Sequence, residues 1–196
     1  MGCPIGTTAI LCSLATCNTE GLAQYGADTI IPRSVRLILL DCFETLIELT
    51  ERGYVPRRGI PEFLRTFVRE RQVPVVVISD ASEELIVAAL KQAALRHLIQ
   101  GIYHAGNAEE VLPDGRRRKR LDVPLADFQL TGPEAVFVGD SPLDAEAAHH
   151  HQLPFIRVPR SEDSAFTFAA LITGPSRYQS AHFTALMLER YRPKPP

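Results

Sequence analysis

Several features are absent from this sequence, and each absence narrows the range of possible functions. No stretch approaches the ~18 consecutive apolar residues of a membrane-spanning helix, so we expect no membrane span. The four cysteines form no CxxC pair and no Cys/His cluster with zinc-like spacing, which favours a disulfide-free protein. Neither sign of charge dominates: the net charge of -2 argues against coating nucleic acid through global charge, although a local basic patch stays possible.

The N-terminus contains an apolar segment, residues 10–17, that must be distinguished from an export signal. No Lys or Arg precedes this segment, and it is short for a signal peptide. Gly6 occupies the position at which N-myristoylation prefers Ser or Thr. We therefore expect neither export nor lipidation, and we predict a cytoplasmic protein.

The composition is that of an ordinary globular protein. The 196 residues are 45% hydrophobic and 22% charged, which suits one domain with a full hydrophobic core. We find no internal repeat and no low-complexity segment. The pattern predicts an N-terminal helical extension (1–33), an α/β core (34–160) and a C-terminal helical tail packed on the core (161–196).

Within the core, short apolar runs of strand length alternate with amphipathic helical segments. Such alternation predicts a three-layer, Rossmann-like parallel sheet of about five strands with helices on both faces. The expected strands are 36–40, 73–78, 99–103, 135–138 and 154–158, and the expected helices are 61–70, 81–97, 124–130 and 143–151. The Pro113-Asp114-Gly115 turn also predicts a hairpin that pairs 109–112 with a strand from Arg117.

Polar residues stand where three of these strands end. Asp41 and then Thr45 follow the first strand, Ser79 follows the second, and Asp140 and Ser141 follow the fourth. Ligands of open α/β sheets bind beyond the carboxyl ends of the strands, so we expect these residues to share one site.

These motifs, in this order, resemble those of the haloacid dehalogenase-like superfamily of aspartate-nucleophile hydrolases, which are mostly phosphatases. The motifs are Leu37-Ile38-Leu39-Leu40-Asp41, Val75-Val76-Val77-Ile78-Ser79, Lys119, and Gly139-Asp140-Ser141-Pro142-Leu143-Asp144. The resemblance covers roughly residues 33–160. It implies a phosphomonoester phosphatase that acts through an aspartyl-phosphate on Asp41.

The resemblance also implies a Mg²⁺ site. A carboxylate can attack a phosphoryl group only if positive charge offsets its repulsion from the phosphoryl oxygens, and Mg²⁺ supplies that charge. By the family pattern, the ion is held by Asp41, by the backbone carbonyl of Phe43 and by Asp140, with support from Asp144. The alternative interpretation is that Asp41 and Asp140 are ordinary loop carboxylates that bind no metal.

Other residues are expected to hold the substrate. Ser79 and Lys119 would bind the phosphoryl oxygens, although Ser79 could instead cap the following helix. Lys119 stands in a basic run, 116–120, and the sequence does not show which side chain turns inward or whether the rest is a solvated surface. The further candidates for substrate contact are Thr45, Arg57, Arg58 and Ser141.

Position 43 departs from the family pattern. Phosphatases of the family carry an Asp there, which protonates the leaving group and then activates water, and Phe43 can do neither. General acid–base help is worth about 10²–10⁴ in rate. Three interpretations stay open: a weak phosphatase that uses Glu44, Glu48 or another acid, a dehalogenase, or a degenerate phosphate-binding or regulatory module.

The spacing of the motifs leaves no room for a large cap domain. The interval from Asp41 to Ser79 holds a flap and a helix, and the interval from Ser79 to Lys119 holds a helix, a strand and a hairpin. The resemblance then implies an open site, suited to macromolecular or extended phosphorylated substrates or to a cover from a second subunit. His149-His150-His151 follows a helix, and because consecutive helical residues point in different directions, we interpret it as a surface feature.

Overall fold

The computed structural model describes residues 31–162 and 166–173. The expected N-terminal extension, and most of the expected C-terminal tail, lie outside the described residues. Within the described part of the chain, no helix has both the length and the apolar character needed to cross a membrane.

The core is a five-stranded, fully parallel sheet with the order β5-β4-β1-β8-β9. Its strands are β1 (Leu37–Leu40), β4 (Val75–Ile78), β5 (Gly101–Tyr103), β8 (Ala135–Gly139) and β9 (Phe155–Arg157). The three central strands are completely buried and consist mainly of aliphatic residues, as expected for strands covered on both faces. β1 lies at the centre, paired with β4 and β8, so the residues that follow these three strands emerge side by side.

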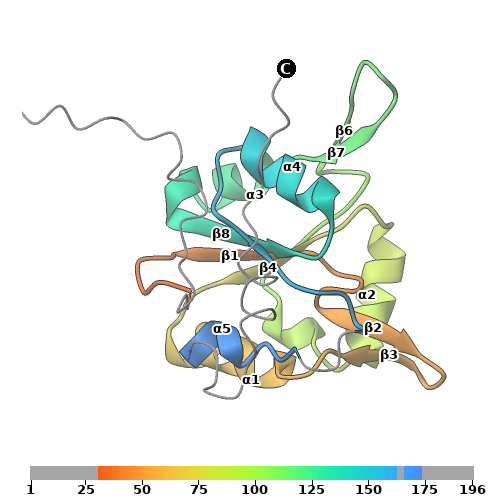
Figure 1. Cartoon of the computed structure of the whole chain (residues 1–196), viewed down its shortest axis with the longest axis vertical. Coiled ribbons are helices and arrows are strands. Elements are labelled where there is room, and N and C mark those ends of the chain that lie inside the picture. The colour runs from red at the N-terminus through yellow and green to blue at the C-terminus, as the bar shows by residue number, and fades with distance from the viewer. Residues whose placement is uncertain (1–30, 163–165, 174–196) are drawn as a thin grey trace, which may run out of the picture.

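Helices cover both faces of the sheet (Figure 1). Along β1, Ile38 and Leu40 belong to one buried cluster, whereas Leu37 and Leu39 belong to another. The first cluster includes residues of α1 (Ile60–Leu64), η2 (Arg65–Glu70), α2 (Glu83–Gln92) and α5 (Ala170–Thr173). The second includes residues of α3 (Asp122–Asp127) and α4 (Pro142–His150). This period of two along a strand between helical layers confirms the predicted three-layer fold.

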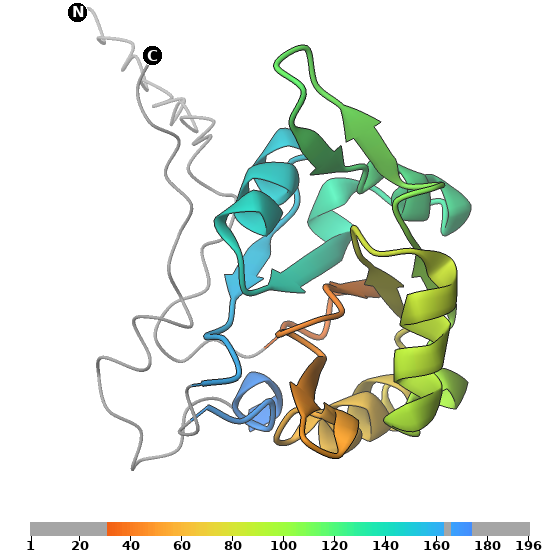
Figure 2. The same cartoon turned by 90° about the vertical axis from the view of Figure 1, so that its right-hand side faces the viewer.

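Two antiparallel hairpins lie outside the sheet. β2 (Ile47–Thr50) pairs with β3 (Gly53–Pro56), and β6 (Glu109–Val111) pairs with β7 (Arg117–Lys119). Both lie on the right-hand side of Figure 1, the side that faces the viewer in Figure 2. The first hairpin is fastened to α2, because Gln92 Oε1 accepts a hydrogen bond of 3.1 Å from the backbone N–H of Tyr54.

The segments between the motifs contain no separate cap domain, as predicted. The β2–β3 hairpin, α1 and η2 fill the interval from Asp41 to Ser79. The interval from Ser79 to Lys119 holds α2, a short 3₁₀ turn η3 (Arg96–Leu98), β5 and the β6–β7 hairpin. A second short 3₁₀ turn, η4 (Gly132–Glu134), leads into β8.

Two predicted helices differ from the observed ones. The helix expected over 81–97 ends at Gln92, because Ala94 has a left-handed conformation with φ of 57° that stops the helix. The helix expected over 61–70 widens after Leu64 into the π-helical segment η2, in which the N–H of Arg71 bonds to the carbonyl of Thr66 five residues earlier.

Candidate active site

Three buried carboxylates meet at the carboxyl ends of β1 and β8. Asp41 follows β1, Asp140 follows β8, and Asp144 lies in the first turn of α4. One carboxylate oxygen of each lies within 4.8 Å of those of the other two. The pairing of β1 with β8 explains this juxtaposition, because it places Leu40 beside Val138, and the N–H of Asp41 bonds to the carbonyl of Val138.

Lys119 provides the positive charge for this cluster. It ends β7, and its Nζ lies 2.5 Å from Asp41 Oδ1 and 2.6 Å from Asp144 Oδ1. Although burial opposes the charged form, the two carboxylates raise the pKa of Lys119 well above its usual range, so the ammonium group stays charged. Of the basic run 116–120, Lys119 is therefore the residue that turns inward to Asp41.

The other basic residues of this run are paired with acidic side chains at the surface. Arg116 bonds to Asp114 and Glu146, Arg117 to Glu109, Arg118 to Glu110, and Arg120 to Asp122. This pairing corresponds to the solvated-surface interpretation of the run and leaves little net positive charge for a phosphate-rich patch.

Burial raises the pKa of Asp41 to about 7. Lys119 opposes this shift, whereas the negative charges of Asp144 and Asp140 add to it. The carboxyl group of Asp41 therefore exchanges its proton near neutral pH in the protein without a bound ion.

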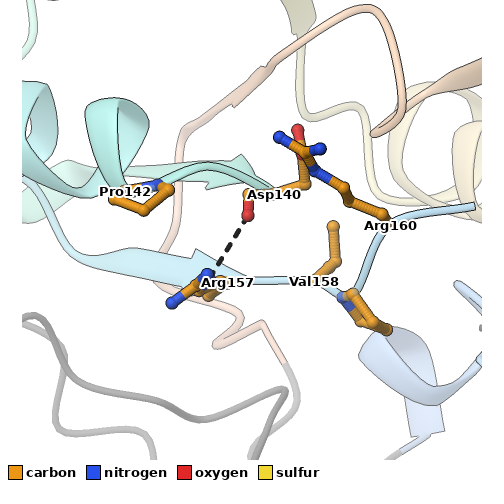
Figure 3. A pocket seen from close by; sticks show the side chains of 6 residues that line it. Asp140, Pro142, Arg157, Val158 and Arg160 are labelled. Carbon is orange, nitrogen blue, oxygen red and sulfur yellow. Dashed lines mark hydrogen bonds and ion pairs between the residues drawn. The ribbon is translucent and has the colours of Figure 1, made fainter.

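Asp140 is held by three residues from different parts of the chain. Thr45 Oγ1 donates to Asp140 Oδ1 at 3.0 Å, and Arg160 Nε donates to Oδ2 at 3.0 Å. Arg157 Nε donates to the Asp140 carbonyl at 3.2 Å, as Figure 3 shows. We expected Thr45 to contact substrate, but the structure places its buried hydroxyl on Asp140, where it orients that carboxylate. The sequence did not predict Arg157 or Arg160 for this site, because only the fold brings the last residue of β9 and the loop after it to the end of β8.

Ser141 and Asp144 form the N-terminal capping box of α4. Ser141 Oγ donates to Asp144 Oδ2 at 2.7 Å and accepts from the N–H of Asp144 at 3.1 Å. Gly139 leaves the space that this carboxylate needs, since a Cβ at residue 139 would lie 2.6 Å from Asp144 Oδ2. The Gly-Asp-Ser-x-x-Asp spacing thus has a local structural reason, and the substrate contact expected of Ser141 stays a prediction.

Ser79 is buried at the end of β4. Its Oγ accepts a bond of 3.3 Å from the N–H of Ala81. The N-cap of α2 is Ser82, whose side chain accepts from the N–H of Leu85. Ser79 is therefore not the helix cap considered from the sequence, and it lies at the same sheet edge as Asp41.

Phe43 stands two residues after Asp41, at the position for which the family resemblance implies an acid–base Asp. Its ring packs on Tyr54 of β3, with the ring centroids 5.5 Å apart. The next residue, Glu44, has a left-handed backbone with φ of 61°, and its carboxylate accepts a hydrogen bond from Ser161 Oγ. The nearest carboxyl group in sequence is thus held by another loop.

Arg57, expected to contact substrate, is instead buried between loops. Its guanidinium donates to the carbonyls of Glu44 at 2.5 Å, Pro159 at 2.7 Å and Arg160 at 3.1 Å. These bonds make it a brace between the loop after β1 and the loop after β9. Arg58 is exposed, and its carbonyl accepts from the N–H of Phe168 at 2.9 Å. The structure brings neither arginine to Lys119.

A cleft of about 380 Å³ opens beside the buried cluster. It is lined by Asp80, Glu109, Arg116, Arg117, Arg118, Lys119, Ser141, Leu143 and Asp144. Its lining thus combines arginine side chains of the β6–β7 hairpin with Lys119 and the first turn of α4. This arrangement can bind an anionic group next to a buried carboxylate.

Comparison with solved structures reveals the same fold in several proteins of low sequence identity. A HAD-superfamily hydrolase of subfamily IA from Geobacter sulfurreducens is 16% identical, with a TM-score of 0.52 over 63% of this chain and 89% of that one. A predicted phosphoglycolate phosphatase from Haemophilus somnus is 14% identical, with a TM-score of 0.55 over 65% and 87%. A mutant of CbbY from Rhodobacter sphaeroides, in complex with xylulose-(1,5)bisphosphate, is 14% identical, with a TM-score of 0.54 over 69% and 91%.

Among curated proteins, none matches this chain significantly. The family model described as haloacid dehalogenase-like hydrolase matches residues 38–158, a range that contains Asp41, Ser79, Lys119, Asp140 and Asp144. This range is well over half of the chain, and the solved structures share its architecture. The chain belongs to the haloacid dehalogenase-like hydrolases.

Proposed function

We propose that this protein is a Mg²⁺-dependent phosphomonoester phosphatase with Asp41 as its nucleophile. The observation that carries the proposal is the position of Lys119, whose Nζ bridges Asp41 and Asp144. A buried ammonium group beside a strand-end carboxylate offsets the repulsion between that carboxylate and the oxygens of a phosphoryl group.

The acidic cluster fits Mg²⁺. This ion prefers oxygen ligands and is commonly held by one or two carboxylates together with substrate oxygens. Asp41 and Asp140 would hold the ion with the backbone carbonyl of Phe43, and Asp144 would support it. Bound there, Mg²⁺ would neutralise charge on the phosphoryl oxygens during transfer.

The residues of the chain then divide the work in two steps. In the first, an oxygen of Asp41 forms a bond to phosphorus while the bond to the leaving oxygen breaks, giving an aspartyl-phosphate and an alkoxide or phenolate, which takes its proton from water. In the second, water attacks phosphorus and releases inorganic phosphate and the Asp41 carboxylate. Lys119 and Ser79 would hold the phosphoryl oxygens in both steps, and Thr45 would keep Asp140 oriented.

Because residue 43 is Phe, its side chain can neither protonate the leaving group in the first step nor activate water in the second. A phenolate departs without a proton at neutral pH, whereas an alkoxide does not, so we expect aryl phosphates to be cleaved faster than alkyl phosphates. The second step also lacks a general base at residue 43. We therefore propose that hydrolysis of the aspartyl-phosphate limits the turnover of aryl phosphates, whose phenolate leaves readily, whereas formation of the aspartyl-phosphate limits the turnover of alkyl phosphates.

The open cleft supports an extended or macromolecular phosphorylated substrate, because the described chain places no cap domain over Lys119. A second subunit could supply a cover. The paired arginines of the β6–β7 hairpin give no support to general nucleic acid binding.

A second candidate function is a phosphate-binding or regulatory module without turnover. The packing of Phe43 on Tyr54, where the family carries its acid–base Asp, favours this alternative. A dehalogenase also suits an aromatic at residue 43, but a small haloacid needs a closed pocket that excludes water.

Hydrolysis of an aryl phosphate, with and without Mg²⁺, tests the proposal, with the Asp41→Asn variant as control. We expect turnover that requires both Mg²⁺ and Asp41. If the protein binds Mg²⁺ and phosphate but releases no phenol, the binding-module function is supported instead. Turnover retained in Asp41→Asn would contradict the covalent mechanism.

A further inference from the structure

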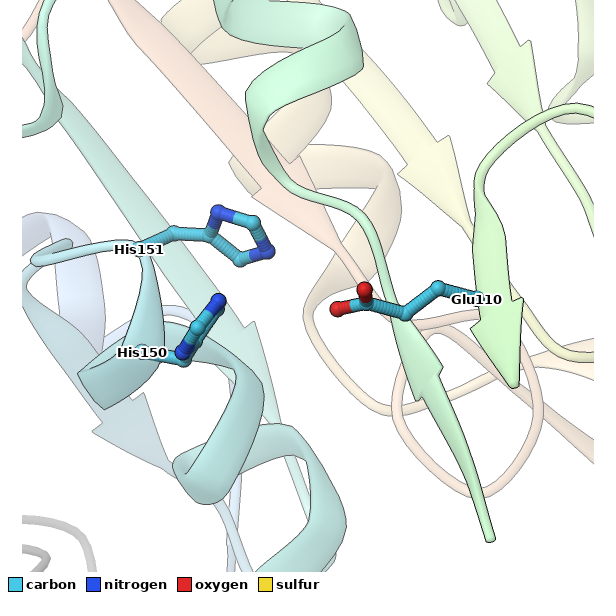
Figure 4. Close-up of side chains that lie close together, drawn as sticks. All are labelled: Glu110, His150 and His151. Atoms are coloured by element: carbon cyan, nitrogen blue, oxygen red, sulfur yellow. The ribbon is translucent and has the colours of Figure 1, made fainter. Parts of the chain in front are cut away.

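A second cluster of metal-ligating side chains lies away from Asp41. Glu110 belongs to β6, His150 ends α4, and His151 is the C-cap of that helix. One ligand atom from each of these residues lies within 4.8 Å of the other two, and Figure 4 shows the three side chains directed toward one another. The rings of His150 and His151 are nearly perpendicular, with their centroids 4.7 Å apart. The sequence expectation that consecutive histidines diverge fails for this pair, because His151 is the C-cap of α4 and its backbone is not helical.

His151 has an unsatisfied nitrogen in this cluster. Its Nε2 is buried and has no hydrogen-bond partner in the described part of the chain. A buried polar atom without a partner is costly and is uncommon in folded proteins. Its other ring nitrogen, Nδ1, faces Asp122 Oδ1 at 3.8 Å. Burial also lowers the pKa of His151, which favours the neutral imidazole at pH 7.

This arrangement is typical of a histidine that ligates a metal. The negative charge of Asp122, 3.8 Å from Nδ1, favours the tautomer that carries its proton on Nδ1, and the lone pair of Nε2 is then available to an ion. Two imidazoles and one carboxylate form a ligand set that Zn²⁺ accepts, with water in its fourth position. The oxygen-only cluster of Asp41, Asp140 and Asp144 suits Mg²⁺ better, so the two sites differ in chemistry.

We propose that Glu110, His150 and His151 bind one Zn²⁺ ion. Bonds of about 2.0–2.1 Å in a tetrahedral site require the ligand atoms to lie about 3.4 Å apart, so the side chains, whose ligand atoms lie within 4.8 Å of one another, must close by up to about 1.4 Å. His150 is exposed and Glu110 lies on a two-stranded hairpin, and both can make this movement.

Arg118 occupies part of this space. Its Nε donates to Glu110 Oε1 at 2.8 Å, and its NH2 lies 3.0 Å from His150 Nε2. The guanidinium therefore holds the cluster in the absence of an ion and must move outward when Zn²⁺ binds. Removal of this competing cation should strengthen binding, so Arg118→Gln is expected to raise the affinity for Zn²⁺.

Binding of Zn²⁺ at this position would couple to the active site through two elements. Glu110 pairs with Arg118 across the β6–β7 hairpin, and the next residue of β7 is Lys119. The two histidines end α4, the helix that begins beside Asp144. The ion would thus fasten the hairpin that carries Lys119 to the helix that carries Asp144.

Calorimetric titration of the full chain with Zn²⁺ tests the proposal. Excess Mg²⁺ is kept present to occupy the acidic cluster. We expect one Zn²⁺ per chain, with affinity weakened at least about tenfold in His151→Gln and in Glu110→Gln, because each removes a ligand. His149→Gln is the matched control, since this exposed neighbour on the same helix lies outside the cluster, and its affinity should equal that of the native chain.

Cobalt provides a spectroscopic readout that is independent of activity. Co²⁺ bound in a four-coordinate site with histidine ligands should give visible absorption that disappears in Glu110→Gln and persists in Asp41→Asn. Glu110 lies on the β6–β7 hairpin and belongs to neither buried hydrophobic cluster. Glu110→Gln should therefore remove a metal ligand without unfolding the core. Absence of Zn²⁺ binding in the presence of Mg²⁺ would overturn the proposal, and so would an affinity equal to that of the native chain in both His151→Gln and Glu110→Gln.

Discussion

Phe43 and Tyr54 pack against each other, with their ring centroids 5.5 Å apart and their planes tilted by 58°. This contact joins the loop after β1 to the β2–β3 hairpin. The resemblance to haloacid dehalogenase-like phosphatases implies an Asp at residue 43 that protonates the leaving group. Phe43 cannot transfer a proton, and its ring instead packs on the β2–β3 hairpin.

Replacement of Phe43 by Asp should restore the missing chemistry. We expect Phe43→Asp to raise the turnover of an alkyl phosphate by up to about 10²–10⁴. The same change should lower the free energy of unfolding by about 1 kcal/mol, because the ring contact with Tyr54 is lost. Steady-state kinetics and chemical denaturation measure the two effects.

Phe43→Asn is the control for this gain in turnover, since Asn has nearly the same shape as Asp but cannot transfer a proton. It should lose the same ring contact without any increase in turnover. If Phe43→Asp also shows no increase while remaining folded, the site lacks more than this acid, and the binding-module function is favoured.

Lys119 is expected to stabilise the fold as well as to bind substrate. In Lys119→Met, Asp41 and Asp144 lose the buried charge that they share, and removal of one partner from a buried ion pair costs about 3–5 kcal/mol. Urea denaturation measures this loss. Arg120→Met removes the partner of Asp122 in an ion pair whose two side chains are both exposed, and it should change stability by less than about 1 kcal/mol. Equal effects of the two substitutions would contradict the central position of Lys119.

The pKa of Asp41 predicts how Mg²⁺ binding depends on pH. Burial raises this pKa to about 7, and a carboxyl group binds the ion only after it loses its proton. Below pH 7 the proton competes with the ion, so the affinity for Mg²⁺ should fall by about tenfold per pH unit and level off above about pH 8. Calorimetry at several pH values measures this slope. An affinity that stays constant through pH 7 would show that Asp41 is already ionised at lower pH.

Replacement of Arg57 by Gln should lower the free energy of unfolding much more than replacement of Arg58 by Gln. Arg57→Gln leaves the carbonyls of Glu44, Pro159 and Arg160 without their charged donor, and we expect a loss of about 2–3 kcal/mol in the free energy of unfolding. Arg58→Gln should leave stability nearly unchanged, since the Arg58 side chain is exposed. If Arg57→Gln raised the KM and left stability unchanged, the substrate contact first expected from the sequence would be correct.

Much of the fold follows from local sequence patterns. The apolar run before Asp41 and the run before Asp140 each predicted a buried parallel strand, because only strands covered on both faces are apolar at every position. The Pro113-Asp114-Gly115 turn predicted the β6–β7 hairpin in the same way, since Gly115 has the positive φ of 83° that such turns require.

The contacts between distant segments could not be predicted. Arg160 and Thr45 meet at Asp140 only because β8 lies between β1 and β9 in the sheet. Arg57 lies in a polar flap and was predicted to contact substrate. In the structure Arg57 is buried, and its guanidinium packs over the Phe166 ring, 5.4 Å from the centroid. The early end of α2 at Gln92 also reflects tertiary structure, since Ala94 has no sequence signal for a left-handed conformation.

Detection of a covalent intermediate on Asp41 is the most direct test of the proposal that Asp41 is the nucleophile. The protein is mixed with an aryl phosphate and Mg²⁺, quenched in acid and analysed by peptide mass spectrometry. Because Phe43 provides no base for the second step, we predict that the peptide containing Asp41 carries one phosphoryl group during turnover, and that Asp41→Asn carries none. Release of phenol without any phosphorylated Asp41 peptide, or with the phosphoryl group on another residue, would contradict the assignment of Asp41 as nucleophile.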